Sequence, residues 1–344
     1  MTKGKLKIFL GYAAGTGKTY QMLTEAQELK ARGIDVVVGY FEPHARVETI
    51  AKTYSLEFVP RLRLEYRGTT LEDMDTDAVI ARRPQVAVVD EFAHTNIPGS
   101  RRAKRWEDVV QILESGIDVL TSLNVQHIES LNDQVWHVTG IRVRETIPDW
   151  LLDEAAEVVM VDVTPRALLH RMERGVVYSP EKARQAMENF FNEGNLSALR
   201  ELALRQTAHQ VEEQRAEAPI FEGDSAAVST GTECILLWLT PHPATAMLIR
   251  RGRRVANYLG CPCIAAYNES DADAVCQHLA FCANLRIETR ALPGVDPQGA
   301  LAAYARARGV TQILVTRFTP KLIPLVNQIR DLQVTIVSER VRTP

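Results

Sequence analysis

Residues 6–19 read LKIFLGYAAGTGKT, and this stretch decides the fold. Residues 6–10 form a short run that is apolar except for Lys7, which is typical of a strand buried on both faces of a parallel sheet. Residues 17–32 have the composition of a helix that Gly33 ends. Glycines in the intervening loop let backbone N–H groups surround an anion, and the helix N-terminus adds a partial positive charge. The stretch therefore predicts a strand, a phosphate-binding loop and a helix.

The loop follows the GxxxxGK[ST] nucleotide motif except at one position. Tyr12 stands where the strict pattern has glycine, and the nearest glycine, Gly11, comes one residue early. We expect Lys18 to reach the β- and γ-phosphates of ATP and the Thr19 hydroxyl to be a ligand of Mg²⁺. The alternative is a glycine-rich turn with a structural role alone. The residues of this loop that we predict to bind the cofactor are Gly11, Gly15, Thr16, Gly17, Lys18 and Thr19.

A second apolar strand, residues 86–89, ends in Asp90 and Glu91. An aspartate at such a strand end holds Mg²⁺ in proteins with a phosphate-binding loop, so Asp90 is assigned to the nucleotide and its metal. Glu91 is the candidate catalytic residue, because its carboxylate could orient or polarise an attacking water.

Basic and amide residues near these strand ends are further candidates. Arg101 begins a basic cluster that continues through Arg105, and we assign Arg101 to phosphate contact; a solvated helix start is the alternative. Asn124 and Gln126 follow the predicted strand at residues 117–123, and the carboxyl ends of parallel strands are where ligands bind in open α/β sheets. For each single residue, an ordinary hydrogen-bonded loop position is the competing interpretation.

Strand and helix patterns alternate twice along the chain. The first alternation predicts strands at residues 6–10, 34–41, 86–89, 117–123 and 158–161, with helices at 17–32, 104–115, 128–138 and from 165. The second predicts strands at 234–239, 263–267, 313–316 and 334–337, with helices at 243–259, 272–285 and 297–308. The fold class is therefore α/β, with a P-loop-type doubly wound parallel sheet followed by a smaller α/β domain. The predicted domains are residues 1–217, which end in helices, and 232–344, joined by a linker at 218–231.

Composition excludes several classes of protein. The 344 residues are 46% hydrophobic and 24% charged with a net charge of −3, which argues against a disordered chain and against a general nucleic-acid binder. The apolar runs are too short to cross a bilayer, and residues 1–5 resemble no secretion signal, so we expect a cytoplasmic chain. The five cysteines are expected to be reduced and mostly buried, because none forms a Cys-x-x-Cys pair.

Three longer motifs make the chain recognisable. They read VDEFAHTNIPGSRRAKRW at residues 89–106, LNVQHIESLND at 123–133 and RVRET at 142–146. Together they resemble the N-terminal sensor domain of the KdpD family, membrane histidine kinases that control potassium uptake. The resemblance covers about residues 3–215, and the region after the linker looks like the universal stress protein domain that follows in that family.

The resemblance implies that the first domain binds ATP–Mg²⁺ and tunes the activity of a histidine kinase core and its response regulator. This chain has no predicted membrane helix and no phospho-accepting histidine domain, so it is either a piece of a longer sensor on the cytosolic face of the membrane or a natural short form. Some relatives bind cyclic di-AMP in the second domain, but of their motif only Ala265 and Tyr267 match here, and a docking or dimerising role is preferred. Direct nucleic-acid binding is not expected.

Two functions remain open from the sequence. The leading hypothesis is an ATP-binding regulatory module in a potassium or turgor response. The rival is an ATPase or small-molecule kinase in its own right, for which Glu91 and the cluster of Arg101 to Arg105 are the supporting features. An interaction scaffold that binds no nucleotide is the third possibility.

Overall fold

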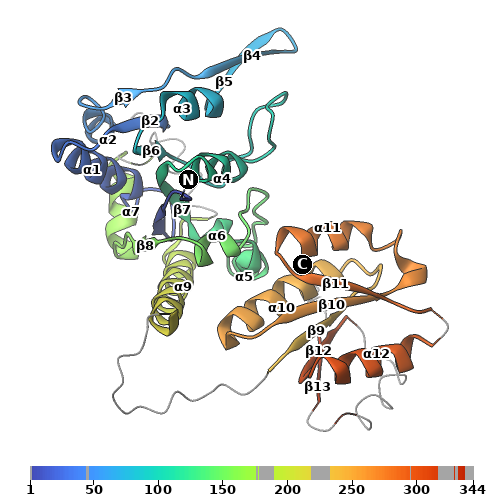
Figure 1. Ribbon diagram of the computed structural model, residues 1–344. Helices are drawn as coiled ribbons and strands as arrows, with labels where there is room; N and C mark the ends of the chain where they lie inside the picture. Colours follow the sequence, from blue (N-terminus) through green and yellow to red (C-terminus); the bar gives the residue numbers. More distant parts are fainter. Residues whose placement is uncertain are drawn as a thin grey trace, which may run out of the picture. The chain divides into compact units, whose positions relative to one another are not determined.

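Two α/β units make up the structure. The computed structural model describes residues 2–43, 46–175, 177, 190–217, 233–294, 296–316, 329 and 332–337. Contacts divide the chain into unit 1, Met1–Glu212, and unit 2, Glu213–Pro344, and each unit contains a parallel sheet with helices between its strands (Figure 1). The predicted fold class is confirmed. The predicted linker at 218–231 lies outside the described residues, so the domain limits stay a prediction.

Unit 1 is built on a six-stranded parallel sheet with the order β3-β2-β6-β7-β1-β8. Its strands are β1 (Leu6–Gly11), β2 (Val36–Tyr40), β3 (Glu57–Phe58), β6 (Val86–Val89), β7 (Asp118–Asn124) and β8 (Glu157–Met160), and a separate antiparallel hairpin consists of β4 (Leu62–Tyr66) and β5 (Thr69–Asp73). Its helices are α1 (Lys18–Ala31), α2 (Val47–Ala51), α3 (Thr76–Arg82), α4 (Arg105–Glu114), α5 (Asn132–Thr139), α6 (Trp150–Asp153), α7 (Pro165–Glu173) and α9 (Glu193–Glu217), with 3₁₀ turns η1 (Val125–His127) and η2 (Glu129–Leu131).

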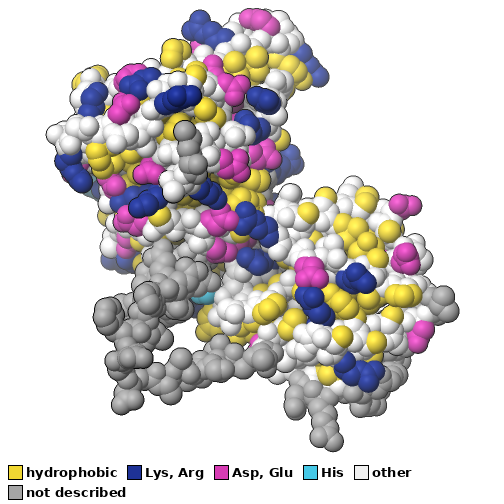
Figure 2. All heavy atoms as spheres, viewed as in Figure 1, with side chains coloured by type: hydrophobic (Ala, Val, Ile, Leu, Met, Phe, Trp, Pro, Cys, Tyr) yellow, Lys and Arg dark blue, Asp and Glu magenta, His cyan; other side chains and the backbone are white. Residues whose placement is uncertain are grey.

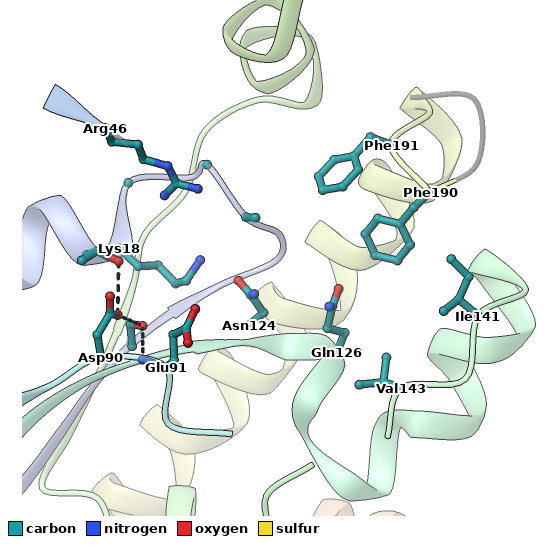
Figure 3. Close-up of a pocket in the computed structure, with 15 residues that line it drawn as sticks. Lys18, Arg46, Asp90, Glu91, Asn124, Gln126, Ile141, Val143, Phe190 and Phe191 are labelled. Atoms are coloured by element: carbon teal, nitrogen blue, oxygen red, sulfur yellow. Dashed lines mark hydrogen bonds between the residues drawn. The ribbon is translucent and has the colours of Figure 1, made fainter. Parts of the chain in front are cut away.

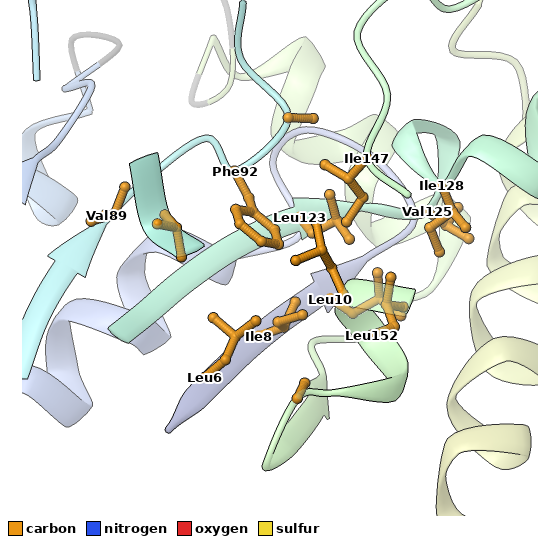
Figure 4. Packing of buried hydrophobic residues seen from close by; sticks show 14 of the residues in the cluster. Leu6, Ile8, Leu10, Val89, Phe92, Leu123, Val125, Ile128, Ile147 and Leu152 are labelled. Atoms are coloured by element: carbon orange, nitrogen blue, oxygen red, sulfur yellow. The ribbon is translucent and has the colours of Figure 1, made fainter. Parts of the chain in front are cut away.

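Alternate residues of β1 pack into two different cores. Ile8 and Leu10 face a large core that α4, α6, α7 and α9 cover, and Figure 4 shows them packed beside Phe92 and Leu123. Phe9 points to the opposite face, where it meets Met22 of α1. Because both faces are covered, the strand is apolar from Ile8 to Leu10, and only Lys7 near its start carries a charge.

The region between β2 and β6 contains elements that the sequence patterns did not predict. The hairpin β4–β5 lies here, beside α3 and the edge strand β3 (Figure 1). Most of its residues are exposed, and Arg63 pairs with Glu72 across the two strands (2.9 Å). A hairpin held by such surface pairs has no continuous apolar run, so it lacked the signal that identified the buried strands.

One predicted helix begins later than expected. The sequence pattern predicted a helix over residues 128–138, but the chain forms the two 3₁₀ turns η1 and η2 before α5 begins at Asn132. Backbone hydrogen bonds join His127 and Glu129 to Ile147 in a parallel bridge, and this pairing keeps Ile128 extended between the two turns, so the helix begins only at Asn132.

Unit 2 repeats the doubly wound plan with a five-stranded parallel sheet, order β11-β10-β9-β12-β13. The strands are β9 (Ile235–Trp238), β10 (Cys263–Asn268), β11 (Glu288–Leu292), β12 (Gln312–Val315) and β13 (Gln333–Ile336), and the helices are α10 (Thr245–Leu259), α11 (Cys276–Asn284) and α12 (Pro297–Ala307), with a 3₁₀ turn η3 (Glu269–Asp271). Helices α10 and α11 cover one face of the sheet and α12 covers the other. The sequence predicted each of these strands except β11, whose first three residues are exposed.

Charged side chains of both signs are mixed on the visible face of unit 1 (Figure 2). None of the helices in the described part of the chain combines the length and hydropathy that a membrane span needs.

The packing of α10 on β9 yields a stability prediction. A Cβ atom at Gly252 would lie 2.2 Å from Cδ2 of Leu237, a fully buried side chain with little room to move. We expect Gly252→Ala to lower the free energy of unfolding of unit 2 by about 1–3 kcal/mol, the usual cost of overpacking a core. Chemical denaturation measures it, with Arg251→Ala at the neighbouring exposed position as the control. Equal midpoints for both variants would show that the close approach of α10 to the sheet is wrong.

Candidate functional site

The strand order of unit 1 brings the carboxyl ends of three strands together. Strand β7 lies between β1, which leads into the glycine-rich loop, and β6, which leads into Asp90. In the register of these parallel strands Gly11 lies beside Asn124 and Val89 lies beside Thr121. The phosphate loop, the acidic strand end and the amide-bearing turn therefore meet at one edge of the sheet, where ligands bind in this class of fold.

The loop itself requires glycine at several positions. Gly15 and Gly17 have φ values of +88° and +107°, which side chains with a Cβ rarely adopt. A Cβ at Gly15 would also lie 2.5 Å from Cγ2 of Val177, and one at Gly11 would lie 2.5 Å from Oγ1 of Thr16. Gly11 thus serves the loop through the space it leaves for Thr16, although it does not line a cavity.

Lys18 is buried at the start of α1. Its Nζ donates hydrogen bonds to the Ala13 carbonyl oxygen (3.0 Å) and to Oγ1 of Thr16 (3.4 Å). Burial lowers the pKa of Lys18 from 10.5 to about 7, and the charge of Arg46 acts in the same direction while that of Asp90 opposes it. An ammonium group held by carbonyl and hydroxyl oxygens, with a second cation nearby, is poised to gain from an anionic ligand.

Two hydroxyl groups and one carboxylate link the first turn of α1, strand β7 and the residue that follows β6. Thr19 Oγ1 donates to Oδ1 of Asp90 (3.2 Å), and Ser122 Oγ donates to the same oxygen (2.5 Å) (Figure 3). Asp90 is 1% exposed, and burial raises the pKa of its carboxyl group although the bond from Ser122 lowers it. A hydroxyl and a carboxylate oxygen side by side are hard donors of the kind that Mg²⁺ prefers.

Glu91 has an unusual backbone conformation. Its φ of +57° lies in the left-handed region, which a residue with a side chain adopts only where its surroundings impose it. Its carboxylate Oε2 lies 3.9 Å from Nη1 of the buried Arg105 and 4.0 Å from Nδ1 of His94. The backbone thus turns Glu91 away from the path of β6 and toward the cavity that it lines.

A cavity of about 420 Å³ opens over Lys18, Thr19, Asp90 and Glu91. Asn124 and Gln126 point into it, and Ile141, Val143, Phe190 and Phe191 form its apolar side (Figure 3). Oδ1 of Asn124 and Oε1 of Gln126 are buried and have no hydrogen-bond partner among the described residues. Buried amide oxygens without partners are costly, so they favour a polar ligand in this space.

A second cavity of about 780 Å³ lies on the other side of the loop. Its lining includes Thr16, Thr19, Tyr20 and Thr24 together with three arginines, Arg46, Arg171 and Arg174. Arg171 Nη1 donates to the Gly15 carbonyl oxygen (3.2 Å), which fixes the last turn of α7 against the loop. Residues of α1, α2 and α7 border this cavity, its lining does not include Asp90, and it has room for a nucleoside.

The structure places the basic residues differently from the sequence prediction. Arg101 is exposed and faces Asp77 (3.5 Å), and it lines neither cavity. Arg46, which the sequence analysis did not select, lines both cavities, and Figure 3 shows its guanidinium above Lys18. No sequence signal identifies Arg46, because it follows no strand or motif and reaches the loop only through the tertiary fold.

His127, which ends the turn η1 after β7, has a structural partner. It is partly buried, its Nδ1 lies 2.6 Å from the Glu145 carbonyl oxygen, and burial lowers its pKa. Among the residues that the structure describes, no group of three or more His, Cys, Asp or Glu side chains is arranged to hold a metal by itself.

Unit 1 matches a known protein family. Residues 2–211 match the family described as "KdpD: Osmosensitive K+ channel His kinase sensor domain". The chain belongs to the KdpD sensor family. It is 44% identical to the sensor protein KdpD of Escherichia coli over 92% of this chain and 40% identical to that of Clostridium acetobutylicum over 91%. A Synechocystis protein that bears the KdpD name is 44% identical over 91% of this chain.

The relatives differ in how much of them this chain represents. It spans 36% of the Escherichia coli protein and 35% of the Clostridium acetobutylicum protein, but 85% of the Synechocystis protein. The region shared with the two longer KdpD sensors is therefore about a third of their length.

The burial of Lys18 predicts a stability change with a definite pH dependence. At pH 7 and below the folded chain carries this ammonium inside the protein at a cost, whereas between pH 7 and 10.5 the unfolded chain binds a proton that the folded chain lacks. We expect Lys18→Met to raise the free energy of unfolding at pH 7 by a few kcal/mol, with the gain shrinking as the pH approaches 10.5. Thermal unfolding at a series of pH values measures this. A variant less stable than the wild type at pH 7 would contradict the assignment of a strained, buried lysine.

Proposed function

We propose that the chain is an ATP–Mg²⁺-binding regulatory module of a KdpD-type two-component system. The observation that carries the proposal is that Lys18, Thr19 and Asp90 line one cavity at the sheet edge, while Thr19 also lines the second cavity beside it. A bound ATP–Mg²⁺ would supply phosphate charge to the cations and a metal ion to the hydroxyl and carboxylate oxygens. By analogy with the KdpD sensor proteins that the chain resembles, the output of this module is the control of a sensor kinase.

The residues fit that ligand in three respects. Gly15 and Gly17 line the cavity and have the positive φ values that only glycine adopts readily in such a loop. Lys18 and Arg46 supply two positive charges over it. Asn124 and Gln126 offer amide groups on the side of the loop nearest Asp90. We expect Lys18 to bind the β- and γ-phosphates and Arg46 to balance the remaining charge.

A regulatory role is favoured by how the loop is packed. Gly15 lies against Val177 and Leu168 and accepts the hydrogen bond from Arg171 of α7. Phe191, just before α9, lines the cavity and also packs in the core with Leu196 and Leu199 of that helix. A rearrangement of the loop around bound phosphates would therefore change the packing of α7 and α9.

The competing function is turnover of ATP. It is favoured by the forced backbone of Glu91, which directs a carboxylate toward the cavity. Steady turnover that Glu91→Gln abolishes would establish an enzyme, and turnover far below about 1 s⁻¹, the low end of usual enzyme rates, would favour regulation.

The affinity for Mg²⁺–ATP tests the proposed site. Truncating a charged hydrogen-bonding group costs about 1.5–3 kcal/mol, so Lys18→Ala should weaken binding by about tenfold or more, and Arg46→Ala should also weaken it. Arg101→Ala should leave the affinity within about twofold, because interactions of exposed charges are worth little. Titration calorimetry measures all three. An unchanged affinity in Lys18→Ala would refute the site, and a loss in Arg101→Ala alone would restore the sequence prediction over the structural one.

The affinity should also depend on pH. Phosphates favour the charged form of Lys18, whose pKa in the free protein is about 7, so binding at higher pH must draw a proton from the buffer. We expect the affinity to fall by up to about tenfold per pH unit above pH 7.5. Calorimetry in two buffers of different ionisation enthalpy measures the proton uptake directly, and heats that do not depend on the buffer would count against this role of Lys18.

A further inference from the structure

The family motif at residues 92–104 forms a loop that the nucleotide site does not use directly. It starts after Glu91 and ends at Arg105, the first residue of α4. A backbone bridge between Thr95 and Lys104 closes the loop on itself. Its tip contacts the hairpin β4–β5, because a Cβ at Gly99 would lie 3.7 Å from Cδ1 of Leu64 and Ile97 N donates to Oδ2 of Asp73 (3.0 Å). The loop thus connects the nucleotide site with the hairpin.

Arg105 is the centre of this connection. Its side chain is fully buried, with the guanidinium 3.6 Å from the ring centroid of Tyr40. Nη2 donates to Oδ1 of Asp73 (2.6 Å), the last residue of β5, and Nη1 donates to the Asp90 carbonyl oxygen (3.3 Å). The same Nη1 lies 3.9 Å from the Glu91 carboxylate. One guanidinium therefore faces one carboxylate from the hairpin and one from the nucleotide site.

A guanidinium group that is buried away from solvent needs an anionic partner, because an unpaired buried charge is costly. Breaking a buried ion pair by removing one partner costs about 3–5 kcal/mol, because the other charge stays buried and unpaired. When one of the two carboxylates moves away from Arg105, the guanidinium pairs more strongly with the carboxylate that remains. Arg105 is thus a shared partner for which Asp73 and Glu91 compete.

We propose that Arg105 couples the nucleotide site to the β4–β5 hairpin, so that nucleotide binding stabilises the hairpin through Asp73. The inference rests on the proposed function. A metal-bound nucleotide beside Asp90 attracts the Glu91 carboxylate toward the cavity, and Arg105 then pairs with Asp73 alone. By reciprocity, a partner that stabilises the hairpin strengthens nucleotide binding by the same factor.

Hydrogen exchange of the hairpin amides, residues 62–73, tests the coupling in the full chain. Mg²⁺ with the non-hydrolysable analogue AMP-PNP is the probe, and calorimetry confirms occupancy for each protein. We expect the wild-type hairpin to exchange about fivefold or more slowly with the nucleotide, within the usual range of allosteric coupling. Asp73→Asn should show no change in the hairpin at saturating nucleotide, and it should bind the nucleotide more weakly than the wild type, because Arg105 then holds the Glu91 carboxylate more firmly. Asp77→Asn, which removes the exposed partner of Arg101, is the matched control and should respond like the wild type.

A second variant keeps the test decisive if Asp73→Asn fails to fold. Glu91→Gln removes the competing charge, so its hairpin should already exchange slowly without nucleotide. Occupied wild-type protein with an unchanged hairpin would overturn the coupling while leaving the proposed function intact. A full response in Asp73→Asn, or a Glu91→Gln hairpin that exchanges like that of the free wild type, would do the same. Absence of nucleotide binding in the wild type would overturn both proposals.

Discussion

The hydrogen bond from the Thr19 hydroxyl to the Asp90 carboxylate ties the first turn of α1 to the end of β6, although β7 separates their parent strands. Ser122 of β7 donates to the same carboxylate oxygen, so the strand between them is bonded to Asp90 as well. Lys18 precedes Thr19 and Glu91 follows Asp90 in the sequence, so this junction brings the lysine and the second carboxylate to the same cavity. A metal–phosphate site at this edge needs the three strand ends in register, and the parallel sheet with two covered faces supplies that register.

Several groups at the site are unfavourable in the folded protein by themselves. Lys18 and Asp90 are buried ionisable side chains. Burial lowers the pKa of Lys18 and raises the pKa of Asp90, which in both cases favours the neutral form. Glu91 has a left-handed backbone, and two buried amide oxygens have no partner among the described residues. The apolar cores on both sides of the sheet hold these groups in place. Such a concentration of unfavourable features in one place is typical of functional sites, where stability is exchanged for binding.

Much of the fold and part of the site followed from the sequence. Buried strands such as β1 and β6 were predicted because burial on two faces requires continuous apolar runs, and Lys18, Thr19, Asp90 and Asn124 were identified because they follow those strands. The hairpin β4–β5 and the edge strand β11 were missed because exposed strands have no such runs. Arg46 and the pairing of Arg105 with Asp73 depend on contacts between distant segments, which local patterns do not encode. The basic cluster was recognised as a group, but only the fold separates the buried Arg105 from the exposed Arg101.

A crystal structure of the chain with Mg²⁺ and AMP-PNP would show directly whether the loop binds the phosphates. We expect phosphate oxygens within hydrogen-bonding distance of Lys18 Nζ, which would leave the Ala13 carbonyl, and a metal ion beside Thr19 Oγ1 and Asp90. The adenosine should lie on the side of Arg171 and Tyr20. A nucleotide bound elsewhere, or phosphates on the loop with Lys18 still bonded to Ala13, would contradict the proposed site.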